Sequence, residues 1–279
     1  MYIELVHNCI CTLGAILHTS PDIMDGGEFY LTLPSNASQD VYGNNTISNY
    51  RTKLAKPIIL KEPYEVGLIE LQYPRTWYTF TDRVDGEITF IDTGGNTAEV
   101  TLVPGVYVDI RSIVTEINNL LPLQTLTKKI TLMYNVITNR AFFMNAEGLI
   151  VTFKGRLAII LGFKPGKPFS IPSLKHSKKY APHPADIYGG YYNIYIYTDI
   201  ADYQLVGNSY VNLLRTINIA DEKRTMPHVQ YDRPHYTPLS RSVIGDIEIS
   251  LKTDQDLYVP FTYGKVIVKL HFRPLRRRL

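Results

Sequence analysis

Residues 245–251 read Gly-Asp-Ile-Glu-Ile-Ser-Leu, and residues 265–272 read Lys-Val-Ile-Val-Lys-Leu-His-Phe. Apolar side chains recur at every second position of both stretches, with polar or charged residues between most of them. A period of two is that of a β-strand with one face turned to a core. Both stretches therefore predict strands. The positions predicted to face the core are Ile247, Ile249, Leu251, Val266, Val268 and Leu270.

Six more segments have the composition and the turn residues of strands. They are residues 28–33, 50–60, 64–73, 191–200, 211–219 and 235–242. In the second of them Pro57 predicts an edge or a bulge, since proline cannot donate to a sheet. In the third, Val66, Leu68 and Glu70 fall on one face and Ile69 and Leu71 on the other, an imperfect alternation that is typical of a strand covered on both faces. The total of eight strands predicts a mainly β fold, a single eight-stranded jelly roll of two packed antiparallel sheets.

The middle of the chain has a different pattern and predicts a small α+β insertion between the third and fourth strands. Asp109 precedes apolar residues at helical spacing and predicts an N-cap, and Pro122 ends that helix. A second helix is predicted to end at Gly162. The segments predicted within the insertion are strands at 87–93, 99–103, 129–134, 140–145 and 149–153, and helices at 110–121 and 155–161. Residues 164–186 are rich in lysine and proline, which predicts a linker or surface loop.

These patterns divide the chain into four parts. Residues 1–25 are predicted to be a leader without ordered structure, because they contain no strand or helix that connects to the rest of the chain. Residues 26–74 and 187–273 form the predicted jelly roll. The insertion covers residues 75–186, and residues 274–279 form a basic tail.

Composition and motifs exclude several function classes. The chain has 279 residues and a net charge of +3, which is too small for a protein whose whole surface binds nucleic acid or membrane. No phosphate-binding glycine loop, nucleophile elbow or common zinc spacing is present, and His7, Cys9, Cys11 and His18 match no zinc module. We therefore predict no catalytic, cofactor or metal site and no enzymatic activity. A receptor- or glycan-binding β-sandwich remains an alternative.

Two groups of residues are candidates for contacts with partners. The chain has 21 tyrosines, a residue type enriched at protein interfaces. Five of them crowd one segment and are predicted to lie in part at a subunit boundary: Tyr188, Tyr191, Tyr192, Tyr195 and Tyr197. The second group is the C-terminal arginines, which can neutralise nucleic-acid phosphates or simply keep the tail soluble. They are Arg273, Arg276, Arg277 and Arg278.

Several segments, taken in order, resemble a known family. Among them are Tyr64-Glu-Val-Gly-Leu-Ile-Glu-Leu-Gln-Tyr-Pro74 with Trp77 beyond it, Tyr195-Ile-Tyr-Thr-Asp-Ile200, and the closing Val259-Pro-Phe-Thr-Tyr-Gly-Lys-Val-Ile-Val-Lys-Leu-His-Phe-Arg273. Together they are similar to the minor capsid (penton) proteins of Polinton, or Maverick, elements and of adintoviruses. The resemblance covers residues 28–273, and residues 1–23 match no pattern of the family.

The resemblance implies a structural protein that forms pentamers at the vertices of an icosahedral shell. Its implied partners are further copies of itself and a double jelly-roll major capsid protein, with genomic DNA as a third partner through the basic tail. No membrane partner is implied. The implied location is the virion, after synthesis in the host cell and assembly in the nucleus.

Overall fold

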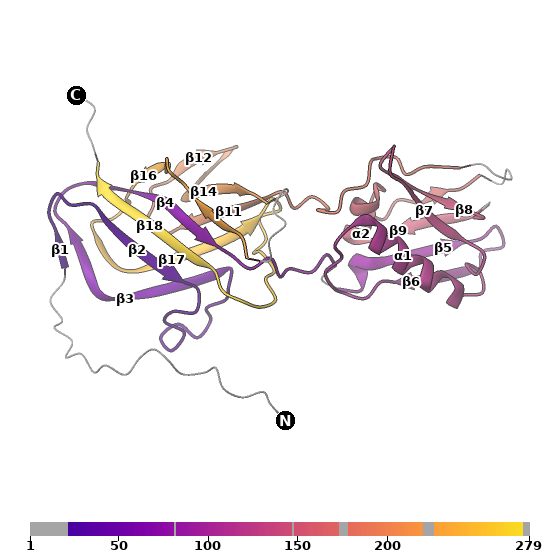
Figure 1. Ribbon diagram of the computed structural model, residues 1–279, viewed down its shortest axis with the longest axis horizontal. Helices are drawn as coiled ribbons and strands as arrows, with labels where there is room; N and C mark the ends of the chain where they lie inside the picture. Colours follow the sequence, from indigo (N-terminus) through magenta and orange to yellow (C-terminus); the bar gives the residue numbers. More distant parts are fainter. Residues whose placement is uncertain (1–21, 81, 147, 173–177, 220–225, 276–279) are drawn as a thin grey trace.

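The computed structural model describes residues 22–80, 82–146, 148–172, 178–219 and 226–275. The described chain is mainly β and has two lobes, joined by two connecting segments (Figure 1). One lobe is built from both ends of the chain and the other from its middle. Each lobe has its own buried hydrophobic cluster.

Two sheets make up the first lobe. One sheet has the order β1-β3-β17-β11-β14. The other has the order β15-β4-β18-β2, and β16 also pairs with β4. The strands of the first sheet are β1 (Asp22–Met24), β3 (Asn49–Leu60), β17 (Val243–Thr253), β11 (Asn193–Thr198) and β14 (Leu213–Asn218). Those of the second are β2 (Phe29–Pro34), β4 (Tyr64–Gln72), β18 (Ile267–Pro274), β15 (His228–Gln230) and β16 (Tyr236–Pro238).

The core of this lobe lies between the two sheets, as in a jelly roll. All six positions that the alternation of β17 and β18 predicts to face the core are buried. Each of the eight predicted segments overlaps a strand, and β1 and β15 are additional short edge strands. A hairpin, β12 (Gln204–Val206) and β13 (Ser209–Val211), also escaped prediction and forms a separate two-stranded sheet.

A β-bulge overturns the predicted faces of β4. Lys269 pairs with Glu70 and Leu270 with Leu68, so Ile69 has no partner in β18. The extra residue reverses the alternation beyond it. Leu71 therefore shares the core with Leu68, contrary to the prediction. Near Pro57 the pairing of β3 with β17 also shifts register, in agreement with the bulge predicted there.

The predicted leader is too long. Asp22–Met24 form β1, which pairs in parallel with residues 58–60 of β3. Lys61 also forms an ion pair with Asp25 at 3.1 Å. The predicted disorder of these residues is wrong, because a three-residue strand carries too short a pattern to detect. The rest of the predicted leader, residues 1–21, lies outside the described residues.

The second lobe combines the sheet β10-β9-β5-β6 with the hairpin β7-β8 and two α-helices. Its elements are η1 (Val84–Gly86), β5 (Glu87–Ile91), β6 (Thr97–Thr101), α1 (Ile110–Leu120), η2 (Leu121–Leu123), β7 (Thr131–Asn135), β8 (Arg140–Met144), β9 (Ile150–Phe153), α2 (Gly155–Leu161) and β10 (Phe169–Ser170). All of them follow β4 and precede β11 in the chain.

The segment 164–186 is not the predicted linker. Ile171, Ala181 and Ala185 belong to the buried cluster of the second lobe. The Ala181 amide donates to the Ala141 carbonyl at 2.7 Å, as an added strand would. Its lysines and prolines suggested a loop, but its few apolar residues cover the lobe's core.

Candidate functional site

The candidate site is the tyrosine-rich segment 188–197, which runs from the junction of the lobes into β11. Within β11, Ile194 and Ile196 are buried in the core, while Tyr195 and Tyr197 alternate with them and are half-buried on the outer face. Alternation therefore turns both strand tyrosines outward. The five tyrosines do not form one surface: two lie on the sheet and three precede it.

Asp254 fixes the start of β11. Its carboxylate accepts hydrogen bonds from the backbone amides of Tyr192 and Asn193 and from the Asn193 side chain, each at 2.8 Å. Burial opposes ionisation of Asp254, but these hydrogen bonds outweigh it and lower the carboxyl pKa. A charged Asp254 thus sets where the tyrosine segment enters the sheet.

The side chain of Tyr192 points toward Asp186 of the preceding segment. Its hydroxyl donates to Asp186 at 2.5 Å, and 43% of the residue is exposed. The hydrogen bond to Asp186, with burial and the carboxylate charge, raises the pKa of Tyr192 to about 12. The phenol is neutral at physiological pH and still presents much of its ring to solvent.

The outer face beside Tyr197 mixes aromatic and charged groups. The Lys252 ammonium lies 5.7 Å from the Tyr197 ring centre and 5.8 Å from that of Tyr258. These residues, with Glu248, line a cavity of about 320 Å³. On the neighbouring strand Arg51 forms ion pairs with Asp246 at 2.8 Å and with Glu248. Such a face suits contact with another protein that is both aromatic and polar.

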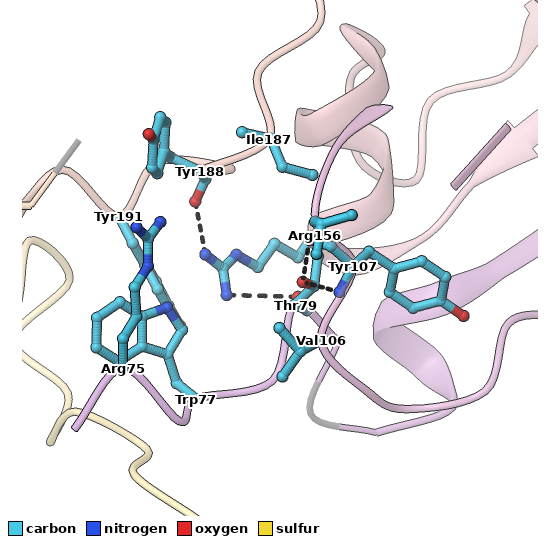
Figure 2. Close-up of a pocket in the computed structure, with 10 residues that line it drawn as sticks. Arg75, Trp77, Thr79, Val106, Tyr107, Arg156, Ile187, Tyr188 and Tyr191 are labelled. Atoms are coloured by element: carbon cyan, nitrogen blue, oxygen red, sulfur yellow. Dashed lines mark hydrogen bonds between the residues drawn. The ribbon is translucent and has the colours of Figure 1, made fainter. Parts of the chain in front are cut away.

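Tyr188 and Tyr191 lie instead at the junction of the lobes, around Arg156 of α2 (Figure 2). The Arg156 guanidinium lies 3.5 Å from the Tyr191 ring centre and donates to the Tyr188 carbonyl at 2.5 Å. Arg75 lies 5.8 Å from the Trp77 ring centre and 5.7 Å from that of Tyr188. These residues surround a cavity of about 410 Å³.

Sequence reasoning missed Arg156, Arg75 and Asp254. A signal for Arg156 existed, because it is the one charged residue in the helix Gly-Arg-Leu-Ala-Ile-Ile-Leu at 155–161. A cation in such an apolar helix must find partners of its own. For Asp254 no local pattern existed, since its three donors lie about sixty residues away in the chain.

The basic residues at the C-terminus are not one group. Arg273 belongs to β18 rather than to a tail, its Nε donates to Glu65 at 2.6 Å, and its guanidinium lies 3.4 Å from the Tyr236 ring centre. The predicted nucleic-acid contacts Arg276, Arg277 and Arg278 lie outside the described residues. Arg273 is therefore already paired within the sheet.

Among the described residues, no three His, Cys, Asp or Glu side chains come together as metal ligands would. Within the same residues no helix is long and apolar enough to span a bilayer.

Comparisons with known proteins bear on the fold. No protein-family model matches the chain, and no curated protein matches its sequence. Among solved structures, the chain is similar to the mavirus penton protein, with a TM-score of 0.51 and 10% sequence identity. The match covers 88% of this chain and 99% of that chain. It extends over both lobes and shows that the two proteins share a fold.

Proposed function

We propose that this chain is a structural minor capsid protein that forms the pentameric vertex, or penton, of an icosahedral shell. The observation that carries the proposal is the similarity to the mavirus penton protein over 88% of the chain. A compact block of two packed sheets is a recurrent building unit of viral shells. In this role the protein works by assembly rather than by catalysis.

The finer proposal is that the shell belongs to a Polinton- or Maverick-type element. Its support is the ordered series of segments that resembles this family. Two of these segments form the neighbouring strands β4 and β18, so part of the resemblance lies in one continuous piece of the lobe's core. We further propose that residues 75–186 are an inserted domain and that a double jelly-roll major capsid protein is the partner. DNA contact through Arg276, Arg277 and Arg278 and assembly in the nucleus complete the proposal.

A ring of identical subunits needs a head-to-tail interface. We propose that the outer face of the first sheet, with Tyr195 and Tyr197, contributes to it. Both rings are held by the strand and are half-buried, so ordering them on contact costs little entropy. The charged residues beside them, Arg51, Glu248 and Lys252, would fix the register of the contact.

Light scattering of the purified chain tests the proposal, alone and with the major capsid protein. We expect a mass of five 31.8-kDa chains in at least one condition and five-bladed rings by negative-stain microscopy. The double variant Tyr195→Ser, Tyr197→Ser should weaken the ring, while Tyr134→Ser in β7 of the second lobe should leave it intact. A chain that stays monomeric in both conditions and never enters shells would contradict the penton assignment.

A further inference from the structure

The cavity between the lobes has no part in the proposed assembly contact. Its walls come from both connecting segments, from the stretch that precedes α1 and from α2 (Figure 2). The volume of about 410 Å³ falls in the range of small-ligand sites. Cationic and aromatic side chains line it, and none of the described residues that line it is acidic.

Arg156 carries a charge that the described part of the chain does not pair. The residue is 8% exposed, and its guanidinium donates only to backbone carbonyls, those of Tyr188 at 2.5 Å, Thr79 at 3.4 Å and Tyr78 at 3.5 Å. Its Nε has no hydrogen-bond partner among the described residues. Tyr191 and the carboxylates of Asp85 and Asp186 favour its charged form, and the Asp85 carboxylate accepts from the Arg156 backbone amide at 3.4 Å. Burial lowers the pKa of Arg156, the mark of a desolvated cation.

Arg75 adds a second cation to the same cavity. It is half-buried and lies near the rings of Trp77 and Tyr188, without an ion pair or hydrogen bond to any described residue. Two neighbouring cations repel each other, and a buried cation is costly unless an anion or several acceptors compensate it. Arg156 has three carbonyl acceptors and Arg75 has none, and no acidic side chain among the described residues lines the cavity, so a bound anion would compensate both cations.

We infer that the cavity binds an oxyanion, a phosphate or carboxylate group, between Arg75 and Arg156. Arginine recognises such groups through paired N–H donors in one plane. The site spans both connecting segments, so a bound anion would also tie the two lobes together. The inference does not depend on a role in a capsid.

The aromatic walls argue for an oxyanion rather than for a stacked base. Arg156 already covers the face of Tyr191 at 3.5 Å, and Arg75 lies over Trp77 and Tyr188. Rings engaged by guanidinium groups hold those cations in place instead of offering free faces for stacking. An anion meets the two cations without displacing either from its ring.

Trp77 offers a direct test because it is the single tryptophan of the chain and lines the cavity. The full chain is titrated with sodium phosphate and, separately, with sodium acetate, each against sodium chloride at equal ionic strength. We expect a saturable change of tryptophan emission that chloride does not produce. Saturation by phosphate assigns the site to phosphate-bearing ligands, and saturation by acetate assigns it to carboxylates.

Variants separate the site from general charge effects. Arg75→Gln should lower the affinity for the anion about tenfold or more, since it removes one charged hydrogen-bonding group. Arg75→Lys should lower this affinity less. As a control, Arg233→Gln removes an exposed arginine of the first lobe and should bind the anion like the wild type. If neither anion gave a saturable response with the wild-type chain, or if Arg75→Gln bound as tightly as the wild type, the inference would be wrong.

Discussion

Gly189 occupies a position where a side chain does not fit. Its φ is +55°, and a Cβ there would lie 2.8 Å from Ile160 Cγ1 and 2.9 Å from Arg156 Nε. Gly190 also has a positive φ, of +90°, but a Cβ there would meet no atom within 4 Å. Substitutions at Gly189 and Gly190 therefore distinguish the cost of backbone strain from that of steric overlap at the junction of the lobes.

We expect Gly190→Ala to lower the free energy of unfolding by about 1 kcal/mol, the cost of a positive φ. Gly189→Ala adds the overlap with Arg156 and Ile160 and should lower it by about 2 kcal/mol or more. Urea-induced unfolding measures both variants. Equal losses would mean that Arg156 moves aside freely, and that the junction is looser than its contacts indicate.

Tyr192 makes the stability of the same junction depend on pH. Its pKa is raised from 10.0 to about 12 by the hydrogen bond to Asp186, so the folded chain holds this proton more tightly than the unfolded chain. The stabilisation is complete below pH 10 and is lost as pH rises through about 12. Tyr192→Phe should lower the free energy of unfolding by about 1 kcal/mol near neutral pH.

The difference in ultraviolet absorbance between the wild type and Tyr192→Phe, measured as pH is raised, follows ionisation of the Tyr192 phenol alone. We expect its midpoint well above that of an exposed tyrosine. Asp186→Asn removes the carboxylate and should move the midpoint of Tyr192 downward. An unchanged midpoint in that variant would show that burial, and not Asp186, raises the pKa.

At the scale of the elements, the helix α1 depends on its N-cap residue, Asp109. The Asp109 carboxylate accepts from the Ser112 amide at 2.7 Å, and the Asp109 amide donates to the Ser112 hydroxyl at 3.3 Å. Asp109→Ala should lower the free energy of unfolding of the second lobe by about 1 kcal/mol, because an amide at the helix start loses its acceptor. Asp109→Asn keeps an acceptor and should cost less.

Circular dichroism during urea unfolding follows this change, since both α-helices that the structure describes belong to the second lobe. A loss as large for Asn as for Ala would mean that the charge of Asp109, rather than its hydrogen bond, stabilises the helix.

Elements with a complete pattern could be predicted from the sequence. The cap at Asp109, the stop at Gly162 and the alternation of β17 and β18 are each set by neighbours in the chain. The bulge at Ile69 could not, since only the pairing with β18 shows that one residue is extra. The burial of part of the segment 164–186 could not be predicted for a similar reason: its three buried residues among those described follow no period, and the core that they cover is formed by other segments.

At the scale of the whole molecule, the junction lay beyond prediction. The cavity needs residues 75–79, 106–108, 156 and 187–191 to meet, and no local pattern indicates that these segments converge. The tyrosines of the segment 188–197 were found because tyrosine is abundant there. Which of them turn to the junction and which to the sheet face depends on where Asp254 starts β11.

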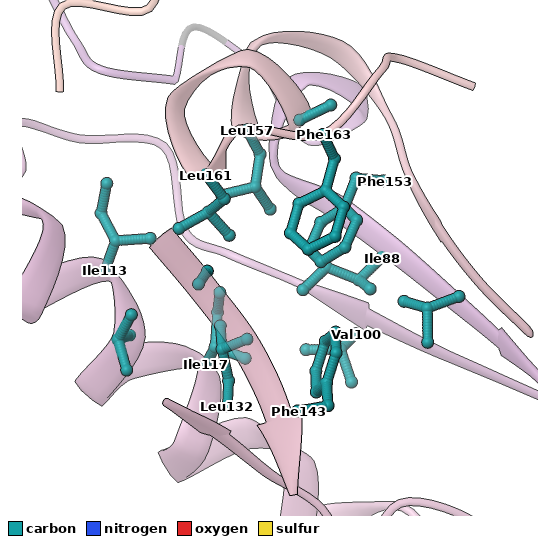
Figure 3. Packing of buried hydrophobic residues seen from close by; sticks show 14 of the residues in the cluster. Ile88, Val100, Ile113, Ile117, Leu132, Phe143, Phe153, Leu157, Leu161 and Phe163 are labelled. Atoms are coloured by element: carbon teal, nitrogen blue, oxygen red, sulfur yellow. The ribbon is translucent and has the colours of Figure 1, made fainter. Parts of the chain in front are cut away.

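The two separate cores predict that the lobes unfold separately. Phe153 is 1% exposed and stacks on Phe163 with ring centres 4.2 Å apart in the second lobe (Figure 3). Phe272 is fully buried in the first lobe and stacks on Phe29 at 4.7 Å. Each phenylalanine therefore reports on one core, and truncation to alanine should cost that core about 3–5 kcal/mol.

Two signals distinguish the lobes during urea unfolding. Circular dichroism of the helices follows the second lobe, and emission of Trp77, which packs against the core of the first lobe, follows that lobe. We expect Phe153→Ala to move the helical transition to lower urea while the Trp77 transition stays in place, and Phe272→Ala to do the reverse. Among the described residues, no helix or strand of one lobe packs extensively on one of the other, so the coupling between the lobes should be small compared with either loss. If both signals shifted together in either variant, the lobes would unfold as one cooperative unit, and Arg156 with its carbonyl partners would be the first contact to test for that coupling.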